Sequence, residues 1–291
     1  MNGVIKFGIP KGSLEQGTVD LFARAGYRIS ISPRNYYPSV DDPGLKLMLI
    51  HSKEVSRYVE DGILDAGLCG HDWVVENKSD VLELAELNYS KSTDSAARWV
   101  LCVPEDSPVR TVKDLQGKRV STELVGVTRR WFESKKVKAS VDFSWGATEV
   151  KCPDLADAIV DITETGSSLR ANKLRIVDTV LESSTRLVVN KQAYKDRVKR
   201  ARIEDLLILL QGALLAKRMV GLMMNVERKH LKKVLALLPS MKNPSISPLA
   251  NGDWVDVVTV IEERQARELI PALKRAGAQG LVEYPLNKVI Y

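Results

Sequence analysis

The sequence predicts an α/β protein with two lobes and a separate C-terminal module. Strand-like and helix-like segments alternate through the first two thirds of the chain. A late strand-like segment, Arg186–Asn190, fits a return of the chain to the first lobe. The last third reads strand, helix, strand, strand, helix, strand. With 291 residues and 44% apolar content, the chain can bury two or three compact cores.

In the first lobe, short apolar runs rich in β-branched residues alternate with amphipathic stretches. The predicted strands are Val4–Ile9, Leu45–Ile50 and Ala66–Cys69, and the predicted helices are Leu14–Ala25 and Lys53–Asp61. This alternation is typical of a parallel sheet covered by helices. We assign residues 1–95 together with 183–205 to this lobe.

A second α/β unit begins near Arg98, where an apolar run ends in Val103-Pro104. A strand to Thr122, a helix and a strand around Val141–Ser144 follow, and the unit closes near Val180. We assign it residues 96–182. Because ligands of such sheets sit at the C-terminal ends of strands, the sequence predicts a binding cleft between the two lobes.

The last third, residues 206–291, begins with a long apolar helical pattern. The helix predicted at Ile203–Val220 contains five consecutive aliphatic residues, Leu206–Leu210, and such a helix is either deeply packed or at a subunit interface. The elements that follow are Val220–Val226, Lys229–Leu238, Ser245–Ser247, Trp254–Ile261, Gln265–Ala276 and Gly280–Tyr284. Their βαββαβ order predicts a ferredoxin-like domain.

Composition excludes several classes of protein. The N-terminus lacks the features of a signal peptide and no apolar run is long enough to span a bilayer, so we expect a cytoplasmic protein without membrane contact. Cys69, Cys102 and Cys152 form no C-x-x-C pair, which argues against a disulfide framework or a structural zinc. The net charge of +6 is mostly scattered, which favours anionic small molecules over nucleic acid.

The most informative segment is Asp157–Asn172, which runs from an apolar strand through a turn into a helical pattern. The turn Thr165-Gly166-Ser167-Ser168 offers backbone N–H groups and hydroxyls at a helix start, which suits phosphate. Asp161, near the end of the strand, suits a sugar diol or a metal. Ordinary βα turn chemistry also selects Gly and Ser at such positions, so both interpretations stay open. Neither the G-x-G-x-x-G nor the G-x-x-x-x-G-K-[ST] phosphate motif occurs here.

Four segments resemble the ATP phosphoribosyltransferases, specifically their long, histidine-regulated form. They are Ile9–Leu14, Asp65–Asp72, Gly146–Val150 followed by Ala156–Asp161, and Thr165–Asn172. The resemblance covers nearly the whole chain. It implies a two-lobed catalytic region similar to periplasmic binding proteins, followed by a regulatory ferredoxin-like domain.

The resemblance implies that adenine N1 of ATP attacks the anomeric carbon of 5-phosphoribosyl 1-pyrophosphate (PRPP), and pyrophosphate leaves. This is the first step of histidine biosynthesis. Adenine N1 is unprotonated at neutral pH, so we assign no acid or base, and expect catalysis by positioning and charge stabilisation. The expected cofactor is Mg²⁺, held mainly through the substrate, with Asp161 as a candidate ligand.

The resemblance also implies binding residues. For PRPP they are Asp157, Asp161, Thr165, Gly166, Ser167, Ser168 and Leu169, and for ATP or pyrophosphate they are Lys11, Gly12, Gly70, Asp72 and Glu149. Asp157 also fits an ordinary surface carboxylate, Lys11 an exposed lysine, and Asp72 a helix N-cap. Trp99, Trp131 and Trp145 are large enough to stack on adenine, although aromatic residues are first of all core material.

Among the departures from the family pattern, three positions bear on the binding of phosphate by arginine. Ser13 stands where an arginine is common, and His51 and Lys53 stand where an Arg-x-Arg-Asp run is expected. Both changes remove a guanidinium that could bind phosphate with two parallel hydrogen bonds. Arg129 and Arg130 are the candidates to replace it.

Regulation and assembly are also implied by the resemblance. Histidine is expected to inhibit by binding the C-terminal module at a subunit interface of a homo-oligomer, a dimer or a hexamer. Candidate contacts are Asn225, Ser247, Leu249 and Ala250.

Two other classes of protein are alternatives. A two-lobed solute-binding protein without activity shares the predicted architecture. A purine phosphoribosyltransferase would carry two adjacent acidic residues before the phosphate loop, and Asp161-Ile162-Thr163 breaks that pattern.

Overall fold

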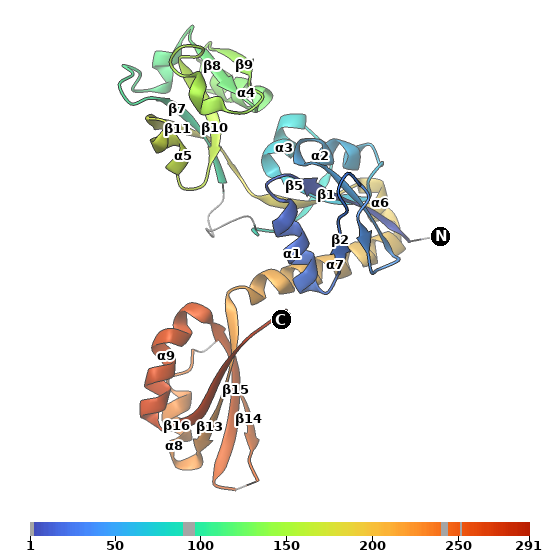
Figure 1. The fold of residues 1–291 in the computed structure, drawn as a ribbon, viewed down its shortest axis with the longest axis vertical. Coiled ribbons are helices and arrows are strands. Elements are labelled where there is room, and N and C mark those ends of the chain that lie inside the picture. The colour runs from blue at the N-terminus through green and yellow to red at the C-terminus, as the bar shows by residue number, and fades with distance from the viewer. Residues whose placement is uncertain (1–2, 90–96, 240–243, 251) are drawn as a thin grey trace. The chain divides into compact units, whose positions relative to one another are not determined.

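The computed structural model describes residues 3–89, 97–239, 244–250 and 252–291. The chain forms two compact units. The first consists of Met1–Asp20 and Arg28–Asp205, and the second of Leu21–Tyr27 and Leu206–Tyr291. The first unit contains two lobes, each built on its own five-stranded sheet (Figure 1). The predicted lobe boundary at 95/96 lies outside the described residues.

The sheet of lobe I has the order β4-β1-β5-β12-β6. Its first three strands are parallel: β4 (Leu45–His51), β1 (Ile5–Lys11) and β5 (Ala66–Gly70). The other two, β12 (Thr185–Val189) and β6 (Leu82–Glu86), pair antiparallel. The sheet is therefore mixed, and the prediction of a parallel sheet was wrong at β12 and β6. The strand expected near Arg186–Asn190 does join the first sheet, as β12.

Helices and short strands surround this sheet. They are α1 (Glu15–Ala25), the pair β2 (Ile29–Ser30) and β3 (Ser39–Val40), α2 (Ser52–Glu60), α3 (His71–Asn77) and α6 (Lys191–Lys195). Helix α2 shows how the packing follows from the sequence. It buries Val55 and Val59, four residues apart on one face, while Arg57 and Glu60 are exposed.

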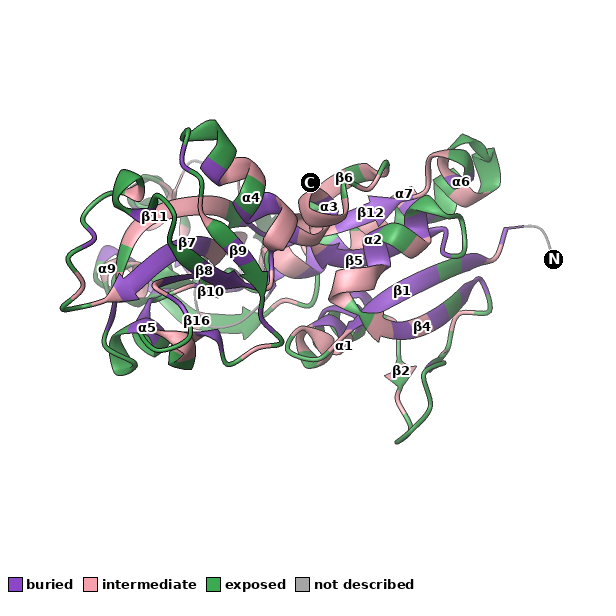
Figure 2. Ribbon diagram, turned by 90° about the horizontal axis from the view of Figure 1, so that it is seen from above, coloured by how far each residue is buried: buried purple, intermediate pink, exposed green. Residues whose placement is uncertain are grey.

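The sheet of lobe II has the order β11-β7-β10-β8-β9. Its strands are β7 (Ala97–Pro104), β8 (Arg119–Thr122), β9 (Ser140–Phe143), β10 (Ala158–Thr163) and β11 (Leu174–Ser183), and its helical segments are η1 (Val112–Leu115), α4 (Val125–Ser134), η2 (Thr148–Lys151) and α5 (Ser167–Ala171). Strands β9, β8 and β10 are parallel, whereas β7 pairs antiparallel with β10 and β11. Figure 2 shows β7 buried and α5 largely exposed, so α5 lies at the surface, next to the loop that precedes it.

Helix α3 of lobe I holds lobe II through polar contacts. The carboxylate of Glu76 accepts the backbone N–H groups of Gly126 and Val127, at 2.8 and 2.7 Å. These N–H groups lie in the first turn of α4, where no partner within the helix exists, and where the helix dipole favours a negative charge. The guanidinium of Arg130 donates to the carbonyl oxygen of Val75 at 2.7 Å. Glu76 and Arg130 together fix α4 against α3.

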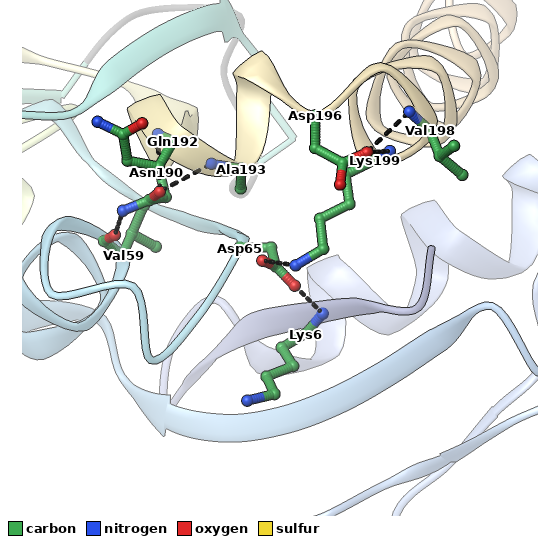
Figure 3. Close-up of polar contacts among 9 residues, drawn as sticks. All are labelled: Lys6, Val59, Asp65, Asn190, Gln192, Ala193, Asp196, Val198 and Lys199. Atoms are coloured by element: carbon green, nitrogen blue, oxygen red, sulfur yellow. Dashed lines mark hydrogen bonds and ion pairs between the residues drawn. The ribbon is translucent and has the colours of Figure 1, made fainter. Parts of the chain in front are cut away.

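Helix α7 (Arg197–Ala216) leads out of the first unit. It begins six residues before the predicted start at Ile203 and ends four residues before the predicted end. Its start is capped by Asp196, whose Oδ1 accepts the N–H groups of Val198 and Lys199 at 2.9 and 3.1 Å (Figure 3). The first turns are basic and carry no apolar stripe, so hydrophobic periodicity did not reveal them.

The second unit contains a four-stranded antiparallel sheet. Its strands are β13 (Met219–Glu227), β14 (Ser245–Pro248), β15 (Trp254–Glu262) and β16 (Ala278–Pro285), in the order β14-β15-β13-β16. Helices α8 (Arg228–Leu235) and α9 (Glu263–Ala276) cover one face (Figure 1). Leu222, Val257 and Leu273 lie in the core between sheet and helices. This is the ferredoxin-like arrangement, and the predicted fold class is confirmed. None of the described helices is both long enough and apolar enough to span a membrane.

Candidate active site

A cleft of about 570 Å³ opens between the lobes of the first unit. On the lobe I side, its wall includes Lys11, His51 and Gly70, which end the parallel strands β1, β4 and β5. On the lobe II side, it includes the end of β10 and the loop after it. The cleft therefore lies at the C-terminal ends of parallel strands, as the sequence predicts.

The loop between β10 and α5 contributes the hydroxyls of Thr165, Ser167 and Ser168 to the cleft wall. Gly166 has φ +72°, a left-handed conformation that glycine adopts without strain. Its N–H donates to Thr163 Oγ1 at 2.8 Å, which closes the turn. The side chain of Leu169 is buried in the lobe II core and anchors α5. Of the five loop residues predicted to bind PRPP, three line the cleft and two shape the loop.

Glu149 meets this loop from the side. It lies in η2, and its carboxylate accepts a hydrogen bond from the hydroxyl of Ser168. The two predicted site residues are therefore in contact, although they come from segments 19 residues apart. Glu149 is not part of the cleft wall itself.

Asp161 and Asp157 lie at different places along β10. Asp161 is half-buried near the end of the strand, beside the loop, and its Oδ1 accepts the N–H of Ile162 at 2.8 Å. Asp157 precedes the strand, and its Oδ2 accepts the N–H of Arg119 at 2.8 Å. Its carboxylate also faces the ammonium of Lys118 at 3.6 Å. The structure does not bring Asp157 to the phosphate loop.

The environment of Asp161 disfavours its charge. Burial raises the pKa of this carboxyl to about 6, and the negative charges of Glu149 and Glu123 add to the rise. A carboxylate held at this cost gains most when a cation or a hydroxyl donor arrives. Strongly shifted groups of this kind are more common at functional sites than elsewhere.

Lys11 and Gly12 form the rim of lobe I. The Lys11 ammonium lies 4.5 Å from the ring centroid of Tyr36 and 3.4 Å from its hydroxyl. Gly12 has φ +101°, and a Cβ built there would meet no atom within 4 Å, so its backbone faces open space. Its N–H donates to Glu15 at 3.4 Å. A ligand can approach this backbone closely, and a phosphate would find the lysine beside it.

Asp72 is buried, with 3% of its surface exposed. Its Oδ2 accepts the indole Nε1–H of Trp99 at 2.7 Å, and its own N–H donates to Ser183 Oγ at 3.1 Å. Burial raises the pKa of this carboxyl, against the lowering effect of its hydrogen bonds. Helix α3 begins at His71 and is preceded by Gly70, so Asp72 is not its N-cap. Its carboxylate binds the strands that cross between the lobes.

Two charged residues face each other across the cleft. The ammonium of Lys53 lies 3.0 Å from a carboxylate oxygen of Glu123, and 5.2 Å from the ring centroid of Trp73. Glu123 was missed by the sequence analysis, although its position directly after the parallel strand β8 is the signal that finds strand-end residues. The crossing segment Ser183–Thr185, which also lines the cleft, carries no motif.

The two arginines that were candidates to replace the missing phosphate-binding guanidinium lie outside the cleft wall. Arg129 donates to the carbonyl of Val141 at 2.8 Å and Arg130 to that of Val75, and neither lines the cleft. Of the three tryptophans considered for stacking, only Trp99 lines the cleft, and its indole N–H is bound to Asp72. The exposed fraction of Trp145 is 91%, and its ring packs edge-on against Phe143.

The predicted effector residues lie in the second unit. Asn225 of β13 and Ser247 of β14 both pair with Asp256 of β15, so the three form one row across the sheet. Asp256 Oδ1 is buried and has no hydrogen-bond partner among the described residues. The N–H of Leu249 donates to the carbonyl of Trp254 at 3.0 Å, and the following Ala250 is exposed.

Comparisons with known proteins agree along the whole chain. Residues 51–212 match the model of the ATP phosphoribosyltransferase family, and residues 216–288 match that of the HisG C-terminal domain. An ATP phosphoribosyltransferase of Thermodesulfovibrio yellowstonii is 57% identical over 287 residues, covering 99% of this chain and 98% of that protein. One from Solibacter usitatus is 55% identical, with 99% of each chain covered.

A solved structure is also similar. It is the ATP phosphoribosyl transferase (HisG:HisZ) complex from Thermotoga maritima, with 26% identity and a TM-score of 0.61. The match covers 72% of this chain and 99% of that chain.

Proposed function

This chain belongs to the ATP phosphoribosyltransferase family, and from that premise we propose how its cleft divides the two substrates. It is a phosphoribosyltransferase of histidine biosynthesis, which joins ATP and PRPP. A solute-binding protein without activity is not favoured, because the family match extends over nearly the whole chain.

Lobe II binds PRPP. The observation that carries this assignment is the loop of Thr165, Ser167 and Ser168, whose hydroxyls line the cleft and which follows the strand that carries Asp161. The 5-phosphate accepts hydrogen bonds from the loop, and Asp161 accepts those of the ribose hydroxyls. Asp157 is left out, because its carboxylate is engaged with Arg119 and Lys118 at the other end of the strand.

Lobe I binds the triphosphate of ATP and the pyrophosphate of PRPP. Lys11 and Lys53 supply the positive charges of this wall, and the open backbone of Gly12, next to Lys11, allows a close approach. Lys53 would exchange Glu123 for phosphate when substrate binds. Asp72 also lines the cleft, and we assign its carboxylate the support of Trp99.

A divalent cation is expected of a phosphoribosyltransferase, and we propose Mg²⁺. Asp161 fits the role of a single protein ligand, because burial and the negative charges of Glu149 and Glu123 raise its pKa, and a cation beside it would offset that cost. A polyphosphate meets this acidic side of the cleft favourably only when a cation lies between them. Asp161 would hold the ion, which keeps most of its water shell. When bound, the ion neutralises charge that develops on the departing pyrophosphate.

The chain itself contributes positioning. Adenine N1 needs no base, so the protein must hold N1 in line with the anomeric carbon. In intramolecular reactions, such alignment of the reacting atoms lowers the activation barrier by several kcal/mol, about 7–11 at best. Lobe II fixes the ribose through the loop and Asp161. Lobe I holds the phosphates, and its lysines stabilise the charge of the leaving group.

We assign the ferredoxin-like domain to inhibition by histidine. The unpartnered buried oxygen of Asp256 supports this, because a buried carboxylate oxygen without a donor is costly and an ammonium or imidazole N–H would satisfy it. Asn225 and Ser247 flank it in the same row. Leu249 and Ala250 follow on the adjoining turn.

The enzyme is proposed to be a homo-oligomer in the cytoplasm, where both substrates occur. The apolar stretch of α7 supports assembly, since 47% of Ile208 is exposed in the single chain. An exposed apolar side chain on such a helix is suited to a contact with a second subunit.

The test is formation of the N1-substituted adenine chromophore from ATP, PRPP and Mg²⁺ in the presence of pyrophosphatase. Asp161→Asn should reduce kcat/KM about 10²-fold or more, as expected for loss of a positioning contact. Asp157→Asn is the matched control, with the same change at the start of the same strand, and should keep activity within a few fold. Equal losses in both variants would contradict the assignment of Asp161.

A further inference from the structure

The first turns of α7 lie against the N-terminal ends of the three parallel strands of lobe I. A Cβ built on Gly3, just before β1, would lie 2.7 Å from Val198 Cγ1. The guanidinium of Arg202 lies directly against Gly44, just before β4. The ammonium of Lys199 lies 2.6 Å from Asp65, just before β5. One face of the helix therefore meets all three strands at the same edge of the sheet.

The opposite ends of these strands line the cleft, at Lys11, His51 and Gly70. The strands are five to seven residues long, so about 15–25 Å separates the helix from the cleft. Strands hydrogen-bonded in register move together rather than bend. A displacement of α7 against this edge would therefore reach the residues that hold the phosphates.

Asp65 is the tightest of the three contacts. Only 6% of this residue is exposed. Its Oδ1 accepts a hydrogen bond from Lys199 Nζ at 2.6 Å, and its Oδ2 accepts the N–H of Lys6 at 2.9 Å (Figure 3). Lys6 belongs to β1, and Asp65 leads directly into β5. A single carboxylate thus joins the linker helix to two strands of the cleft.

Local stability does not explain this pair. A lysine in the first turn of a helix opposes the helix dipole, and the acidic residue at this helix end, the cap Asp196, binds backbone N–H groups and not the Lys199 ammonium. A buried ion pair is often no more stabilising than an apolar contact of the same size. What an ion pair adds is a defined register between two elements. A residue that is unfavourable for its local structure, such as a lysine in the first turn of a helix, often has a functional role.

We propose that the Asp65–Lys199 ion pair couples α7 to the cleft and transmits inhibition from the ferredoxin-like domain. The pair is a positioning device that touches no substrate. Helix α7 begins in the first unit and continues into the second from Leu206, so it connects the two covalently. This inference rests on the proposed inhibition by histidine. Coupling requires that α7 have two positions, one for each activity state.

The test compares three full-length proteins: the wild type, the double variant Asp65→Asn/Lys199→Met, and Asn190→Ala. The double variant leaves no buried charge, and the amide oxygen that replaces the carboxylate can still accept the N–H of Lys6. Asn190 is the control because it lies in the same region and binds the carbonyl of Val59 and the N–H groups of Gln192 and Ala193 (Figure 3), and none of these side-chain hydrogen bonds involves α7.

The double variant is expected to keep its kcat/KM within a few fold, and to need at least about tenfold more histidine for half inhibition. Asn190→Ala should respond as the wild type does. Unchanged inhibition of the double variant, or an equal loss in Asn190→Ala, would overturn the coupling role. A wild type that neither binds histidine nor is inhibited would overturn the proposed regulation, and this inference with it.

A second readout does not depend on turnover. Coupling between two ligands is reciprocal, so ATP and histidine must change each other's affinity by the same factor. Calorimetric titration with histidine, with and without ATP, measures that factor. In the double variant, the factor by which ATP changes the affinity for histidine should fall towards one, while histidine still binds. A factor equal to that of the wild type would contradict the proposal.

Discussion

The indole N–H of Trp99 donates to the carboxylate of Asp72 at 2.7 Å, and so ties the first strand of lobe II to helix α3 of lobe I. Ser183, on the strand that crosses back, binds the backbone N–H of Asp72. Both crossing strands thus meet at one buried residue, Asp72. The indole rings of Trp73 and Trp99 also pack edge to face, with centroids 6.4 Å apart. The geometry of the cleft depends on this junction.

Trp99→Phe is therefore expected to lower the free energy of unfolding by about 1–3 kcal/mol, because the buried Asp72 loses a donor. Urea denaturation followed by circular dichroism measures the change. Trp131→Phe, an indole packed against Phe132 and away from the cleft, is the control and should cost less. If the two variants lost the same stability, the hydrogen bond to Asp72 would not be what matters.

The raised pKa of Asp161 predicts that its ionised carboxylate lowers the stability of the folded protein, although activity requires it. The pKa rises from 3.8 in the unfolded chain to about 6 in the folded protein. The folded state therefore binds the proton more tightly, and the stabilisation present below pH 3.8 is lost as the pH rises through 6. Asp161→Asn should stabilise the enzyme at about pH 7.5, by about 1–2 kcal/mol after solvent screening, while it loses activity.

Denaturation at two pH values checks this sign. At about pH 4 the carboxyl is mostly protonated in the folded state, so Asp161→Asn should leave stability nearly unchanged. At about pH 7.5 the variant should be the more stable protein. The opposite order would mean that the carboxylate of Asp161 is stabilised in the folded state.

The architecture followed from periodicity, because buried strands and amphipathic helices carry a signal at short range. The alternation around Ala66–Gly70 and the βαββαβ order of the last third are examples. The antiparallel pairing of β12 was not visible, because strand direction depends on the path of the chain between lobes. Helix α7 was predicted too late, since its basic first turns pack through Lys199 and Arg202 rather than through an apolar stripe.

Site residues could be predicted where they belong to a motif within one continuous stretch of sequence. The hydroxyls of Thr165, Ser167 and Ser168 could be found, because turn, strand end and helix start follow each other in the chain. Glu123 could not be found that way, because it reaches the cleft only through the parallel pairing of β8 with β10. Asp157 resembled Asp161 in sequence, yet it precedes the strand, and only the structure separates them.

The pH dependence of activity should reflect the same carboxyl. If Asp161 must be ionised to bind the ribose hydroxyls, kcat/KM falls below about pH 6. Glu149→Gln removes a negative charge that raises the pKa of Asp161, so the acid limb should move to lower pH. Glu105→Gln, a surface acid of the same lobe, is the control and should leave the limb in place. An acid limb that stays fixed in Glu149→Gln would assign it to another group.

The ferredoxin-like sheet allows a separate test of the effector site. Asp256→Asn keeps the shape of the side chain but removes the charge that would bind the ammonium or imidazole of histidine. Charged hydrogen bonds contribute about 1.5–3 kcal/mol, so the histidine concentration for half inhibition should rise about tenfold or more. Basal turnover should not change, because Asp256 belongs to the second unit and the cleft to the first. Glu283→Gln, on β16 of the same sheet, removes a charge outside the row and should respond as the wild type does. If Asp256→Asn were inhibited at the wild-type concentration, histidine would have to bind elsewhere, and the buried oxygen of Asp256 would need another partner.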